Sequence, residues 1–146
     1  MGIASRVCRL ITVVILLAAA GCRTQPEMHR PDRWARAWID SLNSHDVRQV
    51  VPLLVRGATY EDPLSHGEQS GLSLAFLLAT TFRWHPQAHY ELGHITADKD
   101  RLVVEWKATG LRTSGDQTPL SGVFVIQFHG DAIASVRGYF DPRGLR

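Results

Sequence analysis

The second half of the chain constrains the fold most, because four runs of residues there have the composition of β-strands. The runs cover residues 88–97, 102–112, 121–129 and 132–140, and short turn sequences rich in Asp, Ser and Gly separate them. Consecutive strands with such short connections pair in an antiparallel arrangement. We therefore predict a four-stranded antiparallel meander.

The segment before this meander begins with helical periodicity. Trp34, Trp38 and Leu42 recur at helical spacing, so that their side chains form one apolar stripe. Asp32 is a suitable N-cap, because its carboxylate can accept a hydrogen bond from a free backbone N–H of the first turn. We predict a helix over residues 32–44.

Three further elements are predicted between this helix and the meander. Asp46 can cap a second helix, which Pro52 should keep short or kinked because proline lacks a backbone N–H. Residues 58–62 are typical of a short strand. Residues 71–82 are apolar on nearly all sides and too many for an ordinary strand, which predicts a buried helix that ends at His85.

The order of these elements predicts an α+β fold. Helices that precede a meander gather against one face of a curved antiparallel sheet, and the two layers share one core. When the helices do not fill the concave side of such a sheet, a cavity remains there. We expect any small-molecule site to lie in that cavity.

Residues 1–21 have the layout of a lipoprotein signal peptide. Arg6 and Arg9 precede an apolar run that is too short to span a bilayer, and small residues lead up to Cys22. We predict that Cys22 becomes the lipid-modified N-terminus and anchors the protein to a membrane through acyl chains such as palmitate. Ordinary signal cleavage after Ala20 is the alternative.

Removal of this signal divides the chain into a tether at residues 22–32 and one domain at residues 33–146. The domain then has no thiol, because the only other cysteine, Cys8, lies in the signal, and this excludes disulfides, thiolate catalysis and cysteine metal sites. The formal charge of +2 comes from Arg6 and Arg9. A nearly neutral domain gives no electrostatic case for nucleic-acid binding.

The predicted compartment follows from the signal. We expect the domain to lie in the cell envelope, on the extracytoplasmic side of the membrane that holds its lipid anchor. In an organism with two membranes the outer membrane is favoured. An aspartate directly after the lipidated cysteine commonly retains lipoproteins at the inner membrane, and this position is Arg23 here.

Several short motifs resemble one known family. They are residues 38–46, Tyr60-Glu61-Asp62-Pro63, His66-Gly67, Glu105-Trp106 and Gly138-Tyr139-Phe140-Asp141. With the order of elements, they make the chain similar to the SnoaL-like branch of the nuclear transport factor two-like superfamily. The resemblance implies a cystatin-like α+β fold, in which a cone-shaped, curved antiparallel sheet packs against three N-terminal helices around a deep apolar pocket. Family members include polyketide cyclases, ketosteroid isomerases, dehydratases and binding domains without catalysis, and many are dimers.

Asp62 is the first candidate for a proton-transfer residue. The segment from Thr59 to Pro63 is similar to the one that carries the proton-moving aspartate of ketosteroid isomerases. An aspartate that ends a strand and faces an apolar pocket loses solvation, which makes its carboxylate a better base. The alternative is structural, with the carboxylate accepting backbone hydrogen bonds and fixing the turn at Pro63.

The same resemblance also marks departures from the isomerases. Those enzymes stabilise an oxyanion with a tyrosine and a protonated aspartate, and Trp38 and Phe124 stand at the corresponding positions. A phenyl ring has no donor, and an indole has one in a different place. Asp141 is a second candidate acid or base, by similarity to SnoaL-like cyclases, and its alternative role is to cap a turn before Pro142.

Five aromatic residues are candidates for lining the predicted pocket and binding a ligand there. Together they suit a flat or polycyclic apolar molecule. The alternative is that they belong to the hydrophobic core. These residues are Trp38, Tyr60, Trp106, Phe124 and Tyr139.

No metal or cofactor site is predicted. The seven histidines show no spacing typical of a metal site, and the sequence has no Gly-rich phosphate loop and no Gly-x-Ser-x-Gly motif. We therefore expect a membrane-anchored envelope lipoprotein whose domain binds a small apolar ligand or a protein partner. The alternative is a cyclase-, isomerase- or dehydratase-like enzyme that uses Asp62 or Asp141 as general acid or base. A scaffolding homodimer is a third interpretation.

Overall fold

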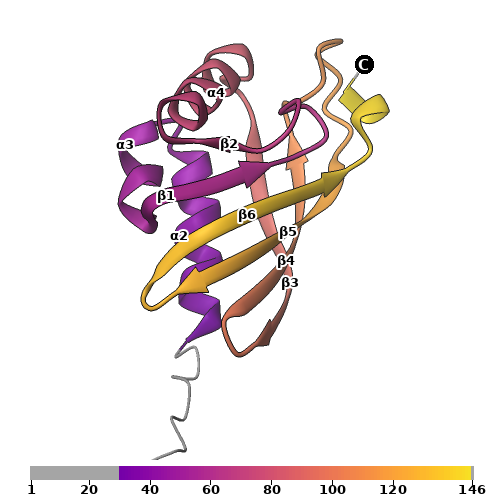
Figure 1. Cartoon of the computed structure of the whole chain (residues 1–146). Helices are drawn as coiled ribbons and strands as arrows, with labels where there is room; N and C mark the ends of the chain where they lie inside the picture. The colour runs from indigo at the N-terminus through magenta and orange to yellow at the C-terminus, as the bar shows by residue number, and fades with distance from the viewer. Residues whose placement is uncertain (1–29, 146) are drawn as a thin grey trace, which may run out of the picture.

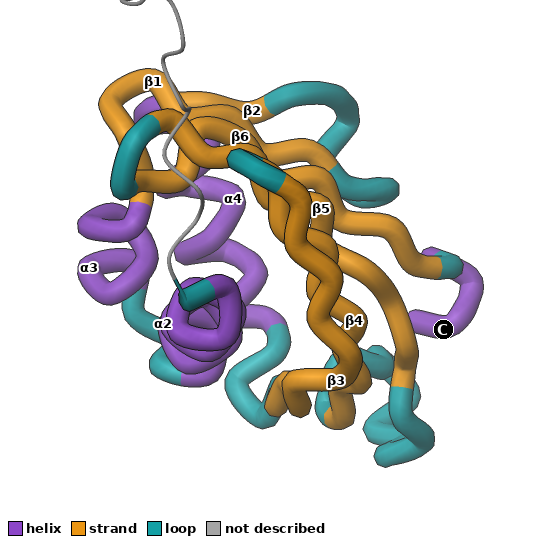
Figure 2. Tube along the Cα trace, turned by 90° about the horizontal axis from the view of Figure 1, so that it is seen from below, coloured by secondary structure: helices purple, strands orange, loops and turns teal. Residues whose placement is uncertain are grey.

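A layer of helices covers one face of a curved sheet in the computed structural model, which describes residues 30–145 (Figures 1 and 2). The predicted signal peptide at residues 1–21, the predicted lipidation site Cys22 and nearly all of the predicted tether lie outside the described residues. No helix among residues 30–145 is both long enough and apolar enough to cross a lipid bilayer.

The described residues form a six-stranded sheet in the order β2-β1-β6-β5-β4-β3. Its strands are β1 (Leu54–Glu61), β2 (Gln69–Ser70), β3 (His89–Asp98), β4 (Arg101–Thr109), β5 (Leu120–His129) and β6 (Ala132–Phe140). Strands β3 to β6 pair in the predicted antiparallel meander. The prediction of an antiparallel sheet is wrong for β1, which pairs with β6 in parallel. Parallel pairing needs a long connection, and the chain between β1 and β6 provides one.

Helix α2 (Pro31–Asn43) begins slightly earlier than predicted. Pro31 occupies its first position, where the missing backbone N–H is tolerated and the fixed φ of proline suits the helix. Arg30 is therefore the N-cap residue, and the prediction that Asp32 caps this helix is wrong. Asp32 lies in the first turn instead, where its negative charge interacts favourably with the positive end of the helix dipole.

Helix α3 (Val47–Val50) is short, as the proline after it led us to expect. Asp46 caps it by accepting a hydrogen bond from the backbone N–H of Arg48 at 2.9 Å. A 3-10 turn, η2 (Val51–Leu53), then contains the proline and leads directly into β1. Strand β1 consequently begins earlier than the predicted strand.

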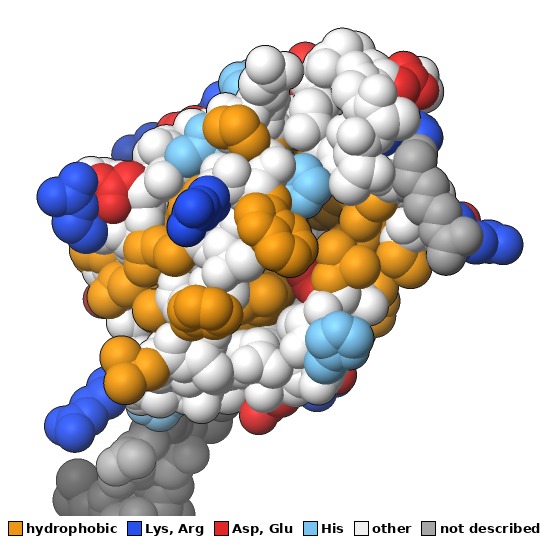
Figure 3. All heavy atoms as spheres, turned by 90° about the horizontal axis from the view of Figure 1, so that it is seen from above, with side chains coloured by type: hydrophobic (Ala, Val, Ile, Leu, Met, Phe, Trp, Pro, Cys, Tyr) orange, Lys and Arg blue, Asp and Glu red, His pale blue; other side chains and the backbone are white. Residues whose placement is uncertain are grey.

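Helix α4 (Gly71–Trp84) covers one end of the sheet and buries only one of its faces. Leu74 and Leu78 point into the core. Three of its large apolar side chains are exposed instead, namely Leu72 at 90%, Phe76 at 74% and Trp84 at 74%. The prediction of a buried helix is therefore wrong for the face of α4 that carries these three side chains. Figure 3 shows hydrophobic side chains on the surface of the molecule seen from this side.

The core lies between α2 and the inner face of the sheet. Trp106 of β4 stacks on Phe124 of β5, with 5.3 Å between ring centroids, and Phe124 meets the edge of Trp38 of α2 at 5.9 Å. Gly122 makes the stacking feasible, because a side-chain methyl group at this position would overlap the indole of Trp106. The aromatic side chains thus fill most of the concave side of the sheet.

Candidate functional site

A cavity of about 70 Å³ remains between α4, the inner face of the sheet and the C-terminal 3-10 turn η3 (Pro142–Leu145). One water molecule needs about 10–15 Å³ on this scale, whereas pockets for whole drug-sized ligands measure about 300–1,000 Å³. The cavity therefore admits a group of a few atoms. Most of its wall is hydrophobic. Apart from the indole N–H of Trp106, its polar side chains are those of Tyr60, Asp62, Thr81, His85 and Tyr90.

The Asp62 carboxylate lies in this wall and uses its two oxygens differently. Its Oδ1 accepts a hydrogen bond from the backbone N–H of Leu64 at 2.8 Å, which closes the turn after β1. Its Oδ2 accepts a hydrogen bond from the hydroxyl of Tyr60, also at 2.8 Å. The Asp62 side chain therefore stabilises the turn, as the structural alternative predicts, and also lines the cavity.

The loop after β1 fixes the backbone of Asp62 as well. Ser65 is 5% exposed, and its Oγ accepts a hydrogen bond from the backbone N–H of Asp62 at 3.0 Å. The Ser65 hydroxyl donates to the carbonyl of Gly67 at 2.8 Å, and the side-chain amide of Gln69 donates to the carbonyl of Ser65 at 2.8 Å. These bonds restrict the direction in which the carboxylate can point.

Gly138 of β6 supports the Tyr60–Asp62 pair from the sheet. A Cβ atom at this position would lie 3.1 Å from the Cβ of Asp62 and 3.6 Å from the hydroxyl oxygen of Tyr60. The parallel pairing of β1 with β6 brings these residues together, since Glu61 is paired with Arg137. The absence of a side chain at Gly138 lets the pair lie close to the sheet.

A second phenol, that of Tyr90, lines the same cavity. The Asn43 side chain holds its backbone, accepting from the Tyr90 N–H at 2.8 Å and donating to the Tyr90 carbonyl at 2.9 Å. Burial raises the pKa of both Tyr60 and Tyr90, and the negative charge of Asp62 raises it further. Both phenols therefore keep their protons at neutral pH. The hydroxyl of Tyr60 is engaged by Asp62, whereas no described group bonds to that of Tyr90.

The charge of the cavity wall is set by very few groups. Among residues 30–145, Asp62 is the only acidic residue that lines the cavity, and no lysine or arginine of this range lines it. Burial lowers the pKa of His85, which favours the neutral imidazole. The described part of the wall thus offers hydrogen-bond donors and one carboxylate but no fixed positive charge.

The predicted ligand-binding aromatics divide into three groups. Tyr60, Trp106 and Phe124 line the cavity. Trp38 is 1% exposed and packs behind Phe124, so it belongs to the core. Tyr139 is 52% exposed, and the expectation that it lines the cavity is wrong, because the alternation along β6 turns its neighbours inward instead.

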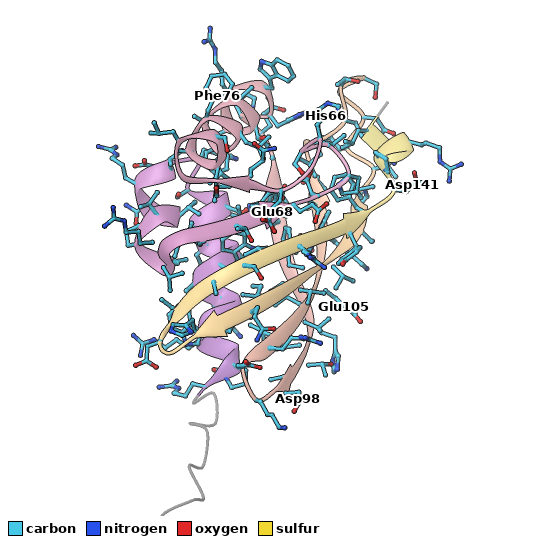
Figure 4. The ribbon with its side chains drawn as sticks, viewed as in Figure 1. His66, Glu68, Phe76, Asp98, Glu105 and Asp141 are labelled. Carbon is cyan, nitrogen blue, oxygen red and sulfur yellow. The ribbon has the colours of Figure 1, made fainter. Side chains whose placement is uncertain are left out.

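Asp141 lies outside the cavity wall. Its carboxylate accepts a hydrogen bond from the backbone N–H of Arg143 at 3.0 Å and pairs with the guanidinium of Arg143 at 2.8 Å. These bonds lower the pKa of Asp141. Figure 4 shows Asp141 near the C-terminal end of the domain, beyond β6. This geometry matches the turn-capping alternative and gives no contact with the Tyr60–Asp62 pair.

Several residues of the cavity wall were not predicted from the sequence. Tyr90 could have been predicted, because it shares the inward face of β3 with Leu92, and Ala88 just before the strand has the same spacing. No comparable signal marks His85, which ends α4, or Leu64, which belongs to an irregular loop. Their positions depend on how α4 and the loop pack over the end of the sheet.

Within residues 30–145, no three His, Cys, Asp or Glu side chains come close enough together to hold a metal ion.

These features define a class of protein, the cystatin-like α+β domains in which helices close a curved sheet over a small cavity. Solved structures of this class are similar to the chain. They include a cystatin-fold protein from Novosphingobium aromaticivorans, with 23% identity, covering 75% of this chain and 97% of that chain at a TM-score of 0.63. A SnoaL-like protein of unknown function from Burkholderia thailandensis has 16% identity, covering 80% and 99% at 0.67. A candidate SnoaL-like polyketide cyclase from Jannaschia sp. CCS1 has 13% identity, covering 79% and 88% at 0.68.

The particular family follows from the sequence. Residues 35–136 match the family description of the SnoaL-like domain, and the chain therefore belongs to the SnoaL-like domain family. No curated protein matches it. The predicted family and the predicted α+β fold are confirmed. At such low identities the solved structures show the fold alone, because one fold hosts many functions.

Proposed function

We propose that the domain binds a small, mainly apolar molecule and holds one polar group of that molecule in the cavity, beside Asp62 and Tyr90. The unused hydroxyl of Tyr90 carries this proposal, because it offers a hydrogen-bond donor inside a mostly hydrophobic wall. A second donor of the wall, the indole N–H of Trp106, is buried without a partner among the described residues. A ligand oxygen in the cavity would satisfy such a donor, and buried polar groups strongly favour having partners.

Occupancy of the cavity is the direct test. The full-length protein is purified from its native host and denatured, and released small molecules are identified by mass spectrometry. Thr81→Phe should abolish the co-purified compound, because Thr81 lines the cavity and the added ring fills it. Thr80→Phe is the matched control, since Thr80 is the adjacent residue of α4 and does not line the cavity. Equal amounts of compound in both variants would contradict the proposal.

We further propose that a lipid on Cys22 anchors the domain to a membrane of the cell envelope. Helix α2 begins at the end of the domain opposite α4 (Figure 1). A tether at this end would keep the cavity side of the domain clear of the membrane surface, which supports the proposal. The intact mass of membrane-extracted protein should exceed that of the polypeptide by acyl groups, and Cys22→Ala should remove them. A soluble, unmodified product would contradict lipidation.

An acid–base enzyme is the second candidate, and the position of Tyr90 favours it. Asp62 can take a proton from the carbon next to a ligand carbonyl, while Tyr90 donates a hydrogen bond to the carbonyl oxygen as negative charge develops there. Tyr90 would thus replace the donors that Trp38 and Phe124 cannot provide. The description of the Jannaschia structure as a candidate cyclase is in keeping with proton-transfer chemistry on this fold.

One variant distinguishes the binding function from the acid–base enzyme. Asp62→Asn keeps the size of the side chain but removes its basicity, so an enzyme should lose turnover of the identified ligand by about 100-fold or more while binding persists. Unchanged turnover would show that Asp62 has a structural role only. The absence of turnover in the parent protein would leave the binding function as the sole candidate.

A further inference from the structure

A ligand of more than a few heavy atoms must extend beyond the cavity. Its volume of about 70 Å³ admits only a few atoms. Leu64 belongs to the cavity wall and is also 46% exposed, which marks it as a residue where the cavity meets the surface. Figure 3 shows a hollow on this side of the molecule, with an acidic side chain at its base and hydrophobic side chains around it.

The apolar surface continues outward from the cavity along α4. Leu77 lines the cavity, and Trp84 follows it by about two helical turns, which places both side chains on the same flank of the helix. Trp84 is 74% exposed. An apolar chain that leaves the cavity therefore finds hydrophobic side chains on α4 as well as on the loop that contains Leu64.

The inner end of the site selects by charge. The Asp62 carboxylate is the acidic group of the wall, and none of the lysines and arginines that the structure describes lies in the wall to balance it. An anionic head group would be placed beside another anion without a compensating cation, which is unfavourable. A neutral oxygen, in contrast, can accept a hydrogen bond from Tyr90 without such a cost.

We propose that the ligand is a neutral amphiphile, with a ketone or hydroxyl oxygen that binds in the cavity at Tyr90 and an apolar body that lies outside it, against Leu64 and Trp84. This inference rests on the proposed binding function and adds the chemical class of the ligand. It excludes fatty acids and phosphate esters as preferred ligands.

Four probes with unbranched alkyl chains of nine or ten carbons test the head group. Decyl methyl ketone, decanol, decanoate and decylamine are titrated at neutral pH into the purified full-length protein by calorimetry, with Thr81→Phe as the filled-cavity reference. The ketone and the alcohol should bind, and decanoate should bind at least about tenfold more weakly, because its charge repels that of Asp62. Tightest binding of decanoate or decylamine would overturn this inference and leave the binding function standing. Failure of all four probes to bind would contradict the binding function itself.

A matched pair of leucine variants tests where the apolar body lies. Leu64→Ser should lower the affinity for decyl methyl ketone by about fivefold, because part of a leucine side chain no longer covers the ligand. Leu72→Ser should leave the affinity unchanged, since Leu72 is 90% exposed and outside the cavity wall. Both side chains are exposed, so both variants should fold. Equal effects of the two substitutions would overturn the proposed position of the apolar body.

Discussion

At the scale of single residues, the site depends on how the Asp62 carboxylate is held. One oxygen closes the turn through Leu64, and the other accepts from Tyr60. Each carboxylate oxygen can accept more than one hydrogen bond, so Oδ2 can still interact with a ligand or take a proton. The turn and Tyr60 therefore orient Asp62 and leave its carboxylate able to accept a further hydrogen bond or a proton.

Removal of the Tyr60 hydroxyl should lower the stability of the protein. Tyr60→Phe leaves the part-buried Oδ2 of Asp62 without its donor, and we expect a loss of about 1–2 kcal/mol in the free energy of unfolding. Urea denaturation followed by circular dichroism measures this quantity. Tyr139→Phe is the control, because Tyr139 is 52% exposed, and its cost should be close to zero. A similar cost for both variants would argue that the Tyr60–Asp62 bond contributes little.

A methyl group at Gly138 should disturb the same pair from the sheet. The predicted contact of 3.1 Å with the Cβ of Asp62 is tighter than ordinary packing, so Asp62 and Tyr60 must shift by a few tenths of an ångström. Gly138→Ala should therefore fold but bind decyl methyl ketone about threefold to tenfold more weakly, since hydrogen bonds weaken with poor geometry. Calorimetric titration gives the affinity, and a thermal melt separates it from global unfolding. Unaltered affinity would show that the pair tolerates displacement.

At the scale of elements, one side chain makes hydrogen bonds from the end of α2 to the sheet. Asn43 is the last residue of α2, and it bonds to both backbone groups of Tyr90. Strand β3 is at the edge of the sheet, where one side of a strand has no neighbouring strand to bond to. The Asn43 amide takes the place of that neighbour and fixes Tyr90 relative to the helix layer.

Loss of the Asn43 amide should loosen this edge. Asn43→Leu leaves the Tyr90 N–H and carbonyl without side-chain partners, which should cost about 1–3 kcal/mol. Hydrogen exchange of the Tyr90 amide should accelerate more than that of amides in β5, which lies inside the sheet. Ser44→Ala, at the neighbouring position and without a bond to β3, serves as the control. If the Asn43→Leu substitution left hydrogen exchange at Tyr90 unchanged, this would contradict the proposal that the two Asn43 hydrogen bonds hold Tyr90 in place.

Sequence patterns predicted those elements whose limits local chemistry determines. The strands of the meander and the short α3 follow from alternation, turn residues and Pro52. The parallel β1–β6 pair could not be predicted, because it joins segments far apart in the chain. The exposed face of α4 was missed for a related reason, since apolar side chains at Leu72 and Phe76 do not reveal that no described element covers them.

At the scale of the whole molecule, the buried phenols make stability depend on pH. Burial raises the pKa of Tyr60 and Tyr90 in the folded state, whereas an unfolded chain has the ordinary tyrosine value of about 10. Below that pH both tyrosines are protonated in the folded and the unfolded state, and their contribution to folding stability is fully present. Above it the unfolded state releases protons that the folded state retains, so folding stability falls as pH rises. His85 acts at the other end, because its lowered pKa makes the folded state lose stability as pH falls through about 6.5.

The alkaline side of this dependence can be measured with one substitution. The free energy of unfolding of the parent protein should decrease steadily above about pH 10, and Tyr90→Phe should decrease less steeply, because one of the two retained protons is gone. Tyr90→Phe is preferred to Tyr60→Phe here, since the Tyr90 hydroxyl has no described partner to lose. Urea denaturation at several alkaline pH values gives the slopes. Identical slopes for the two proteins would mean that Tyr90 ionises equally easily in both states, and the cavity wall around it would then have to be open to solvent.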